Sequence, residues 1–318
     1  MKDEIAAAGA ANSGKFIDPQ VTADGDTRAS VALTGIRTLW VNTGTLCNIA
    51  CSHCYIESSP TNDALVYLSA EEVSAHLDAV LAAGHPVEEV GFTGGEPFMN
   101  PAFPAMVEDA LRRGLRVLIL TNAMKPMMRP VPQEAIQRLN ALYPGQMELR
   151  ISLDHYTASV HDEERGLGSF LSSLTGMRWL RDIGVTLSVA GRGFTGEDEA
   201  SQRAGYAALF AEEGFKIDAY DPARCVIFPE MDMNAPVPEI TTACWGILNK
   251  RPEDQMCATS RMLVKRKGEA PAYAACTLLP YDRGFDMGPE APEVGQEVAL
   301  NHPHCAKFCV LGGASCSV

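Results

Sequence analysis

The chain has 318 residues, and its 26 Lys and Arg against 40 Asp and Glu give a formal net charge of −14. Apolar residues make up 46% and charged residues 21%, which is typical of a globular protein. At roughly 150 residues per domain, this length predicts one large domain, or one large and one small. The acidic balance argues against a nucleic-acid-binding surface, which needs a basic stripe. No apolar stretch reaches the ~18 residues that a membrane-spanning helix needs.

Residues 1–30 contain no apolar segment of the signal-peptide type. We therefore expect a cytoplasmic protein without a membrane partner, in which thiols stay reduced. In that compartment the ten cysteines are more typical of metal binding than of disulfides. Residues 1–35 are rich in Ala, Gly, Asp and Ser and show no periodicity, so we expect a mobile N-terminal tail.

From residue 37 onward, short apolar runs alternate with segments of helical periodicity. The helix near 69–81 is the best marked, because Ser69 and Glu72 have the spacing of a capping box. Further helices are expected at 102–113, 133–142, 169–182 and 197–213. Strands are expected at 37–42, 89–93, 115–121, 148–153, 185–190 and within 216–228.

Six strands alternating with helices predict a parallel sheet of the α/β class. Six units are too few for a closed eight-fold barrel, so a partial (β/α)6 TIM-type barrel or an open doubly wound sheet is expected. In either fold the functional site lies at the carboxyl ends of the strands. After about residue 229 the alternation stops and Pro, Gly and Cys dominate. We therefore divide the chain into a core domain, 36–229, and a Cys-rich region, 230–318.

Three cysteines follow the first strand with the spacing C-x3-C-x2-C, at Cys47, Cys51 and Cys54. Zinc would usually need a fourth ligand, and His53 is poorly placed because it is wedged between two cysteines. Three thiolates suit a [4Fe–4S] cluster with one open iron, the coordination position that catalysis requires. A zinc loop and a chance spacing are the alternatives.

This motif at the end of the first strand resembles that of the radical S-adenosylmethionine (SAM) enzymes. A second match is Gly94-Gly95-Glu96-Pro97, at the end of the second strand. In that family this segment recognises the SAM amino group; glycines allow close backbone approach, and a carboxylate can meet an ammonium. Ser152 and Arg165 match the serine and arginine that meet the ribose or carboxylate of SAM in related enzymes.

The resemblance implies that Cys47, Cys51 and Cys54 bind the cluster and that SAM occupies its open iron. Reductive cleavage of SAM would then yield methionine and a 5′-deoxyadenosyl radical that abstracts hydrogen from a substrate. His53 stands where the family often has an aromatic residue beside the adenine, and we also count Tyr55 among the cofactor-binding residues. Hydrogen abstraction needs no polar base, so no catalytic residue is assigned. A flavodoxin- or ferredoxin-type protein is the expected electron donor.

A second group of cysteines falls in the last 62 residues. The segment 257–276 is expected to be a β-hairpin with Gly268 at its turn, which would bring Cys257 and Cys276 together. The layout resembles the SPASM and twitch extensions of radical SAM enzymes, and it predicts one auxiliary [4Fe–4S] cluster. A zinc ribbon and unliganded buried cysteines are the alternatives. The candidate ligands are Cys257, Cys276, Cys305 and either Cys309 or Cys316, with Cys244, His302 and His304 as less favoured substitutes and Cys225 as a buried thiol.

Relatives with such extensions modify peptides, and others act on small molecules, so a peptide and a small-molecule substrate are both open. About 35 residues precede the first strand, too few for a leader-binding winged helix, so a peptide substrate would need a separate recognition protein or none. Two other activities are alternatives: transfer of a methyl or aminocarboxypropyl group from SAM, and non-catalytic electron carriage.

Overall fold

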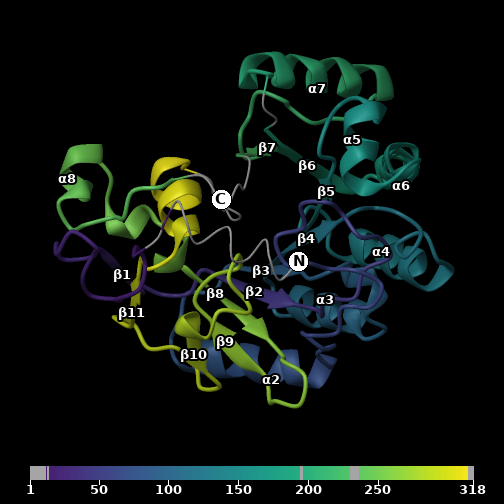
Figure 1. The fold of residues 1–318 in the computed structure, drawn as a ribbon. Coiled ribbons are helices and arrows are strands. Elements are labelled where there is room, and N and C mark those ends of the chain that lie inside the picture. The colour runs from purple at the N-terminus through teal and green to yellow at the C-terminus, as the bar shows by residue number, and fades with distance from the viewer. Residues whose placement is uncertain (1–11, 13, 194–195, 230–235, 314–318) are drawn as a thin grey trace.

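The computed structural model describes residues 12, 14–193, 196–229 and 236–313. Its main feature is a nine-stranded sheet with the order β10-β9-β8-β2-β3-β4-β5-β6-β7. Six of these strands are parallel and adjacent in chain order, and helices α2–α7 lie along their outer side (Figure 1). The six strands are β2 (Thr38–Asn42), β3 (Glu89–Thr93), β4 (Arg116–Thr121), β5 (Met147–Ser152), β6 (Thr186–Arg192) and β7 (Cys225–Phe228).

The predicted partial barrel is therefore confirmed, and five of the six barrel helices fall close to their expected positions, α5 being the one that was not expected. In the capping box of α2, the Ser69 hydroxyl accepts from Glu72 N at 3.1 Å and the Glu72 carboxylate accepts from Ser69 N at 2.8 Å. The helices are α2 (Ala70–Ala82), α3 (Phe103–Arg112), α4 (Pro130–Leu142), α5 (Ala158–Arg165), α6 (Ser169–Asp182) and α7 (Glu199–Glu213).

The C-terminal region adds to the sheet rather than standing apart from it. The expected hairpin is confirmed as β8 (Ser260–Val264) and β9 (Ala272–Ala274), which pair antiparallel, with Gly268 at a φ of 81° between them. The sequence did not indicate that β8 also pairs parallel with β2 and so extends the sheet beyond the barrel. This region also contains α8 (Cys244–Leu248), β10 (Asp286–Gly288), β11 (Glu297–Ala299) and a π-helix at Cys305–Leu311.

The expected N-terminal tail differs from the structure over its second half. β1 (Ser30–Ala32) pairs antiparallel with β11, and Arg28 forms a buried ion pair with Glu239 at 2.5 Å. Those partners lie more than 200 residues away, so no local periodicity could reveal them. Within the described part of the chain, no helix is both long and apolar enough to cross a membrane.

Candidate functional site

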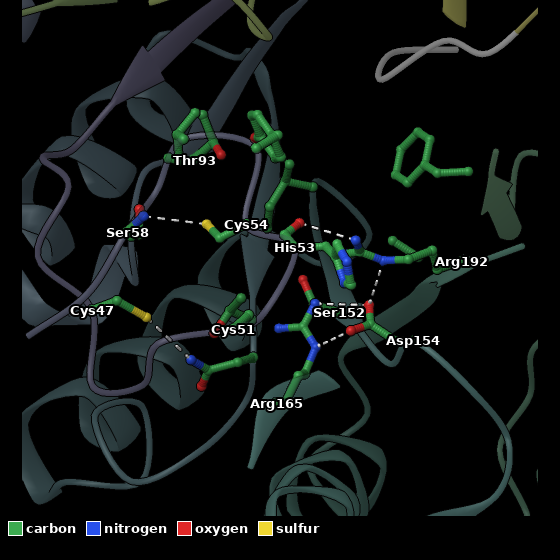
Figure 2. A pocket seen from close by; sticks show the side chains of 18 of the residues that line it. Cys47, Cys51, His53, Cys54, Ser58, Thr93, Ser152, Asp154, Arg165 and Arg192 are labelled. Carbon is green, nitrogen blue, oxygen red and sulfur yellow. Dashed lines mark hydrogen bonds and ion pairs between the residues drawn. The ribbon is translucent and has the colours of Figure 1, made fainter. Parts of the chain in front are cut away.

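A cavity opens at the carboxyl ends of the parallel strands, where a site is expected in this fold (Figure 2). The sequence-predicted residues that line it are Cys47, Cys51, His53, Cys54, Tyr55, Gly94, Gly95, Ser152 and Arg165. The loop after β2, the end of β3, the end of β5 and helix α5 thus contribute to one cavity. These segments lie far apart in sequence, and the topology of the sheet brings them together.

The cysteine loop is held by backbone contacts on several sides. Cys47 N donates to Ser59 O at 3.0 Å, and Ser52 N donates to Glu164 O at 2.9 Å. Ser58 N donates to the Cys54 sulfur at 3.3 Å, which is the kind of contact that stabilises a thiolate. The loop therefore has a defined conformation set by the neighbouring segments.

Burial favours the protonated form of two of these thiols, Cys47 and Cys51, in the absence of a metal. It raises the pKa of Cys47 to about 12. Burial also raises the pKa of Cys51, although the positive charge of Arg165 opposes that rise. Iron binding displaces thiol protons. One buried and two half-buried thiols around one cavity, with a guanidinium nearby, therefore fit an anionic iron–sulfur cluster with three protein ligands.

The paired glycines are required by close packing against the cysteine loop. Gly94 has a φ of 147°, a conformation that other residues rarely adopt. A Cβ on Gly95 would lie 2.2 Å from Leu46 O, directly before Cys47. The two glycines thus place the end of β3 against the cysteine loop, where both residues also line the cavity.

Glu96 and Pro97 are not among the residues that line the cavity. The Glu96 carboxylate is 1% exposed and accepts hydrogen bonds from Thr121 Oγ1 at 2.8 Å and Asn122 N at 2.9 Å, at the end of β4. Burial raises its pKa to about 7. Pro97 begins a buried 3₁₀ turn. The contact of Glu96 with SAM stays a prediction, whereas its contacts with β4 are observed.

Arg165 is held by a carboxylate that motif matching missed. Asp154, two residues beyond the end of β5, accepts from Arg165 Nε at 2.8 Å and from Nη2 at 2.9 Å (Figure 2). Burial alone would raise the pKa of Asp154, but the charge and hydrogen bonds of Arg165, together with the charge of Arg192, lower that pKa overall. Arg192 on β6 donates to His53 O at 3.0 Å and lies 3.9 Å from Asp154. The available signal for Asp154 was its position just beyond the carboxyl end of a parallel strand.

His53 and Tyr55 line the cavity near its opening. The His53 side chain is 65% exposed, and its Nδ1 lies 2.8 Å from a carboxylate oxygen of Glu164 on α5. Tyr55 is 38% exposed. Both positions are compatible with contact to a bound cofactor at the rim of the cavity.

Comparison with known proteins shows to which family this chain belongs. A sequence model of the Radical SAM superfamily matches residues 41–203, about half of the chain. The chain belongs to the radical SAM superfamily. The matched segment runs from β2 into α7 and so includes most of the barrel, and the Cys-rich C-terminus that follows is SPASM-like.

Curated relatives match over less than half of this radical SAM chain. The subtilosin biosynthesis protein AlbA of Bacillus subtilis is 34% identical over 145 residues, which is 45% of this chain and 30% of AlbA. The AdoMet-dependent heme synthase of Oleidesulfovibrio alaskensis is 33% identical over 144 residues, 45% of this chain and 34% of the synthase. The matches thus span about a third of the length of these relatives.

Solved radical SAM structures show the same fold over most of the chain. SuiB of Streptococcus suis bound to its precursor peptide SuiA superposes with a TM-score of 0.56 and 13% identity, covering 89% of this chain and 67% of SuiB. Native anSMEcpe with bound AdoMet gives a TM-score of 0.56 and 13% identity, covering 79% of this chain and 77% of anSMEcpe. At such low identity the likeness concerns the fold.

Four cysteines of the C-terminal extension line a second cavity. They are Cys257, Cys276, Cys305 and Cys309, and Cys316 lies outside the described residues. Burial raises the pKa of Cys305 well above its usual value, and the charges of the other three cysteines raise it further. A [4Fe–4S] cluster takes one thiolate per iron, so four thiols around a cavity fit it. Among the described residues, no group of three or more His, Cys, Asp or Glu is arranged to hold a single metal ion.

The less favoured ligands do not line this second cavity. Cys244 accepts a contact from Thr241 N at 3.4 Å. His302 Nδ1 accepts from His304 N at 3.1 Å, and their rings lie 4.8 Å apart. Cys225 is fully buried at the start of β7, as expected of a structural thiol. Cys309 is therefore the favoured fourth ligand among the described cysteines.

Proposed function

We propose that this chain is an enzyme that binds a [4Fe–4S] cluster through Cys47, Cys51 and Cys54. When bound, the cluster and SAM together supply reductive cleavage to a 5′-deoxyadenosyl radical, which abstracts hydrogen from the substrate. One observation carries the proposal: three thiols, two glycines at a strand end and a buried arginine line the same cavity. Oxidoreductase-type chemistry is the reaction class we assign.

The residues of the chain bind and orient the cofactor in this proposal. Arg165, held by Asp154, would meet the carboxylate of SAM, and Ser152 on the adjacent strand would meet its ribose or carboxylate. Gly94 and Gly95 would present backbone to its amino group. The barrel wall excludes water from a radical that attacks whatever lies nearest, so orientation is the main contribution of the protein.

We further propose that the core domain, 36–229, works with an auxiliary [4Fe–4S] cluster in region 230–318. Leu278 and Phe308 line both cavities, so a single layer of side chains separates them. Phe308 stacks on Phe228 of β7, with ring centroids 5.4 Å apart. A centre this close to the SAM cavity is well placed to accept an electron from an oxidised substrate.

The substrate is proposed to be a peptide, with a small molecule as the second candidate. AlbA is named for bacteriocin biosynthesis and SuiB was solved with a precursor peptide, which favours the peptide. The heme synthases favour a small molecule. A flavodoxin- or ferredoxin-type protein would supply the electrons.

The test is SAM cleavage by the reconstituted protein. The chain is loaded with iron and sulfide without oxygen, reduced with dithionite and given SAM, and the products are identified by mass spectrometry. 5′-Deoxyadenosine and methionine should appear with the wild-type chain and with Cys225→Ala, a matched control at a buried cysteine outside both cavities. They should disappear when Cys47, Cys51 and Cys54 are all replaced by Ala.

Other products would point to the alternative activities. Methylthioadenosine or S-adenosylhomocysteine would indicate group transfer from SAM. Bound iron without any SAM cleavage, even with a reductant, would favour an electron carrier.

A further inference from the structure

Arg261 is a buried cation that uses less than half of its hydrogen-bonding capacity. It lies on β8 and is 1% exposed. Its Nη1 donates to the carbonyl oxygens of Cys257 at 2.5 Å and of Ser260 at 2.8 Å. Its Nε and Nη2 are buried and find no hydrogen-bond partner in the structure. Buried polar groups are normally paired, so the three N–H groups on these two nitrogens call for an explanation.

The other buried arginines all have a carboxylate partner. Arg28 pairs with Glu239, Arg150 with Glu148 and Arg266 with Asp286. Within the described residues Arg261 forms no such ion pair. A guanidinium stays charged at any ordinary pH, so Arg261 places an uncompensated positive charge in the interior. Such a charge is strongly destabilising unless an anion accompanies it.

The groups that act on this charge are cysteines of the second cavity. Cys257 and Cys276 are the ionisable side chains close enough to Arg261 to act on its charge. The carbonyl of Cys257 is also one of its two acceptors. The unpaired cation therefore lies beside the thiols that the proposed auxiliary cluster would use.

We propose that Arg261 is the counter-charge of an anionic iron–sulfur cluster bound by the four cysteines of the second cavity, Cys257, Cys276, Cys305 and Cys309. This inference rests on the auxiliary cluster of the proposed function and goes beyond it. The cluster with four thiolates is an anion, so it supplies the charge that no carboxylate supplies. Arg261 is a positioning residue here, because it acts through the cluster and not on the substrate.

The consequence is a raised reduction potential of that cluster. Reduction adds one electron and makes the cluster more negative, and a fixed cation beside it stabilises the reduced form more than the oxidised form. Charge and hydrogen bonds at the sulfurs are among the main determinants of iron–sulfur potentials. Removing the charge should therefore make the cluster harder to reduce.

The experiment uses the full chain with Cys47, Cys51 and Cys54 replaced by Ala, so that the remaining iron signal comes from the second cavity. Its midpoint potential is measured by a redox titration followed by electron paramagnetic resonance. In Arg261→Met the ratio of reduced to oxidised cluster at the parent midpoint should fall at least tenfold, a shift of about 59 mV for a one-electron couple. Arg261→Lys, which keeps the charge, should shift less than half as far.

Arg266→Met is the matched control, because it removes a buried arginine of the same hairpin region that already has Asp286 as its partner. Its cluster should keep the parent potential. An Arg261→Met cluster with that same potential would overturn the proposal. If Arg261→Met does not fold, Arg261→Gln removes the charge while keeping a hydrogen-bond donor. Its ratio of reduced to oxidised cluster at the parent midpoint should also fall at least tenfold, and an unchanged ratio would overturn the proposal. If the Cys47/Cys51/Cys54→Ala parent binds no iron, the auxiliary cluster of the proposed function is overturned as well. If the parent binds iron and only the potential stays unchanged in Arg261→Met, the role of Arg261 alone is overturned.

Discussion

Asp154 is the residue on which the orientation of Arg165 depends. Its two oxygens accept from Nε and Nη2 of Arg165, while its own side chain is 4% exposed. A guanidinium fixed along one edge presents its remaining N–H groups in a set direction. The pair thus explains how a residue on α5 can be directed at the cavity above β5.

We predict that Asp154→Asn lowers the free energy of unfolding of the iron-free protein by about 3 kcal/mol, because it leaves a buried cation without its anion. SAM affinity should fall about tenfold, one factor of ten being about 1.4 kcal/mol. Urea denaturation and calorimetric titration of the loaded protein measure the two effects. Asp254→Asn is the control, since its ion pair with Arg251 is exposed and should matter by less than about 1 kcal/mol. Equal losses in both variants would contradict the prediction.

Glu96 makes a pH-dependent contribution to stability. Burial raises its folded-state pKa from 4.5 to about 7. A carboxyl with a raised pKa binds its proton more tightly when folded, so this contribution is present below pH 4.5. It is lost as the pH rises through about 7, and the loss amounts to about 3 kcal/mol.

Glu96→Gln should remove this dependence in the iron-free protein. The free energy of unfolding of the variant, relative to the wild type, should rise by about 3 kcal/mol between pH 4.5 and pH 8. Urea denaturation across that range measures the difference, and any fixed cost of the substitution cancels. A difference that stays constant with pH would show that Glu96 is not the titrating group.

At the scale of elements, α6 holds the loop that follows β4. Ser173 Oγ donates to Asn122 O at 2.8 Å, and the side chain of Asn122 reaches the Cys47 sulfur at 3.9 Å. A Cβ on Gly176 would lie 2.0 Å from Ala123 O, so the helix and the loop can approach this closely because residue 176 is glycine. The packing of an outer helix is thereby connected to the cysteine loop at Cys47.

Gly176→Ala should force α6 away from this loop and cost about 2 kcal/mol of stability, as overpacking does. The amount of iron that Cys47, Cys51 and Cys54 bind after reconstitution should fall together with the stability. The control is Gly246→Ala on α8, where a Cβ meets nothing within 4 Å. Thermal unfolding measures the stability of both variants, and iron analysis measures their iron content. If Gly176→Ala changes neither stability nor iron content, the close contact between α6 and the loop is refuted.

The elements that local patterns predicted are those whose partners are also local in the chain. Each strand of the barrel carries its own apolar run, and consecutive units are neighbours in the sheet. The pairing of β8 with β2 and of β1 with β11 joins segments more than 200 residues apart, which periodicity cannot detect. Helix α5 was missed because its sequence, ASVHDEER, has few apolar residues.

In the candidate site, too, local patterns reveal some residues, whereas others depend on long-range contacts. Cys47, Cys51 and Cys54 were found by their spacing within one loop, and Gly94 and Gly95 by a short motif. Asp154 and Arg192 belong to no motif, because their importance comes from contacts with Arg165 and His53 made across the barrel. Arg261 likewise appears as an ordinary strand residue until its unpaired charge is seen in three dimensions.

At the scale of the whole molecule, two thiol-lined cavities share a wall but belong to different hydrophobic cores. The barrel core includes Leu39, Val90 and Ile151. The second core includes Val31 of β1, Val298 of β11 and Phe308. The N-terminal segment thus completes the region that carries the C-terminal cysteines, and Leu278 and Phe308 form the boundary between the cavities.

Because the two thiol sets lie in separate cavities, the two metal centres should load independently. The wild-type chain is expected to bind about eight irons, four for each [4Fe–4S] cluster. Replacing Cys47, Cys51 and Cys54 by Ala should leave about four, and replacing Cys276 and Cys305 by Ala should leave about four.

Iron and sulfide analysis after anaerobic reconstitution gives these counts, with Cys225→Ala as the control that keeps all eight. A Cys47/Cys51/Cys54→Ala variant that loses all its iron would mean that the second cavity holds no cluster. A Cys276→Ala/Cys305→Ala variant that loses all its iron while remaining folded would mean that the first cluster depends on the second. About four irons in each variant would instead locate one cluster on either side of the Leu278 and Phe308 wall.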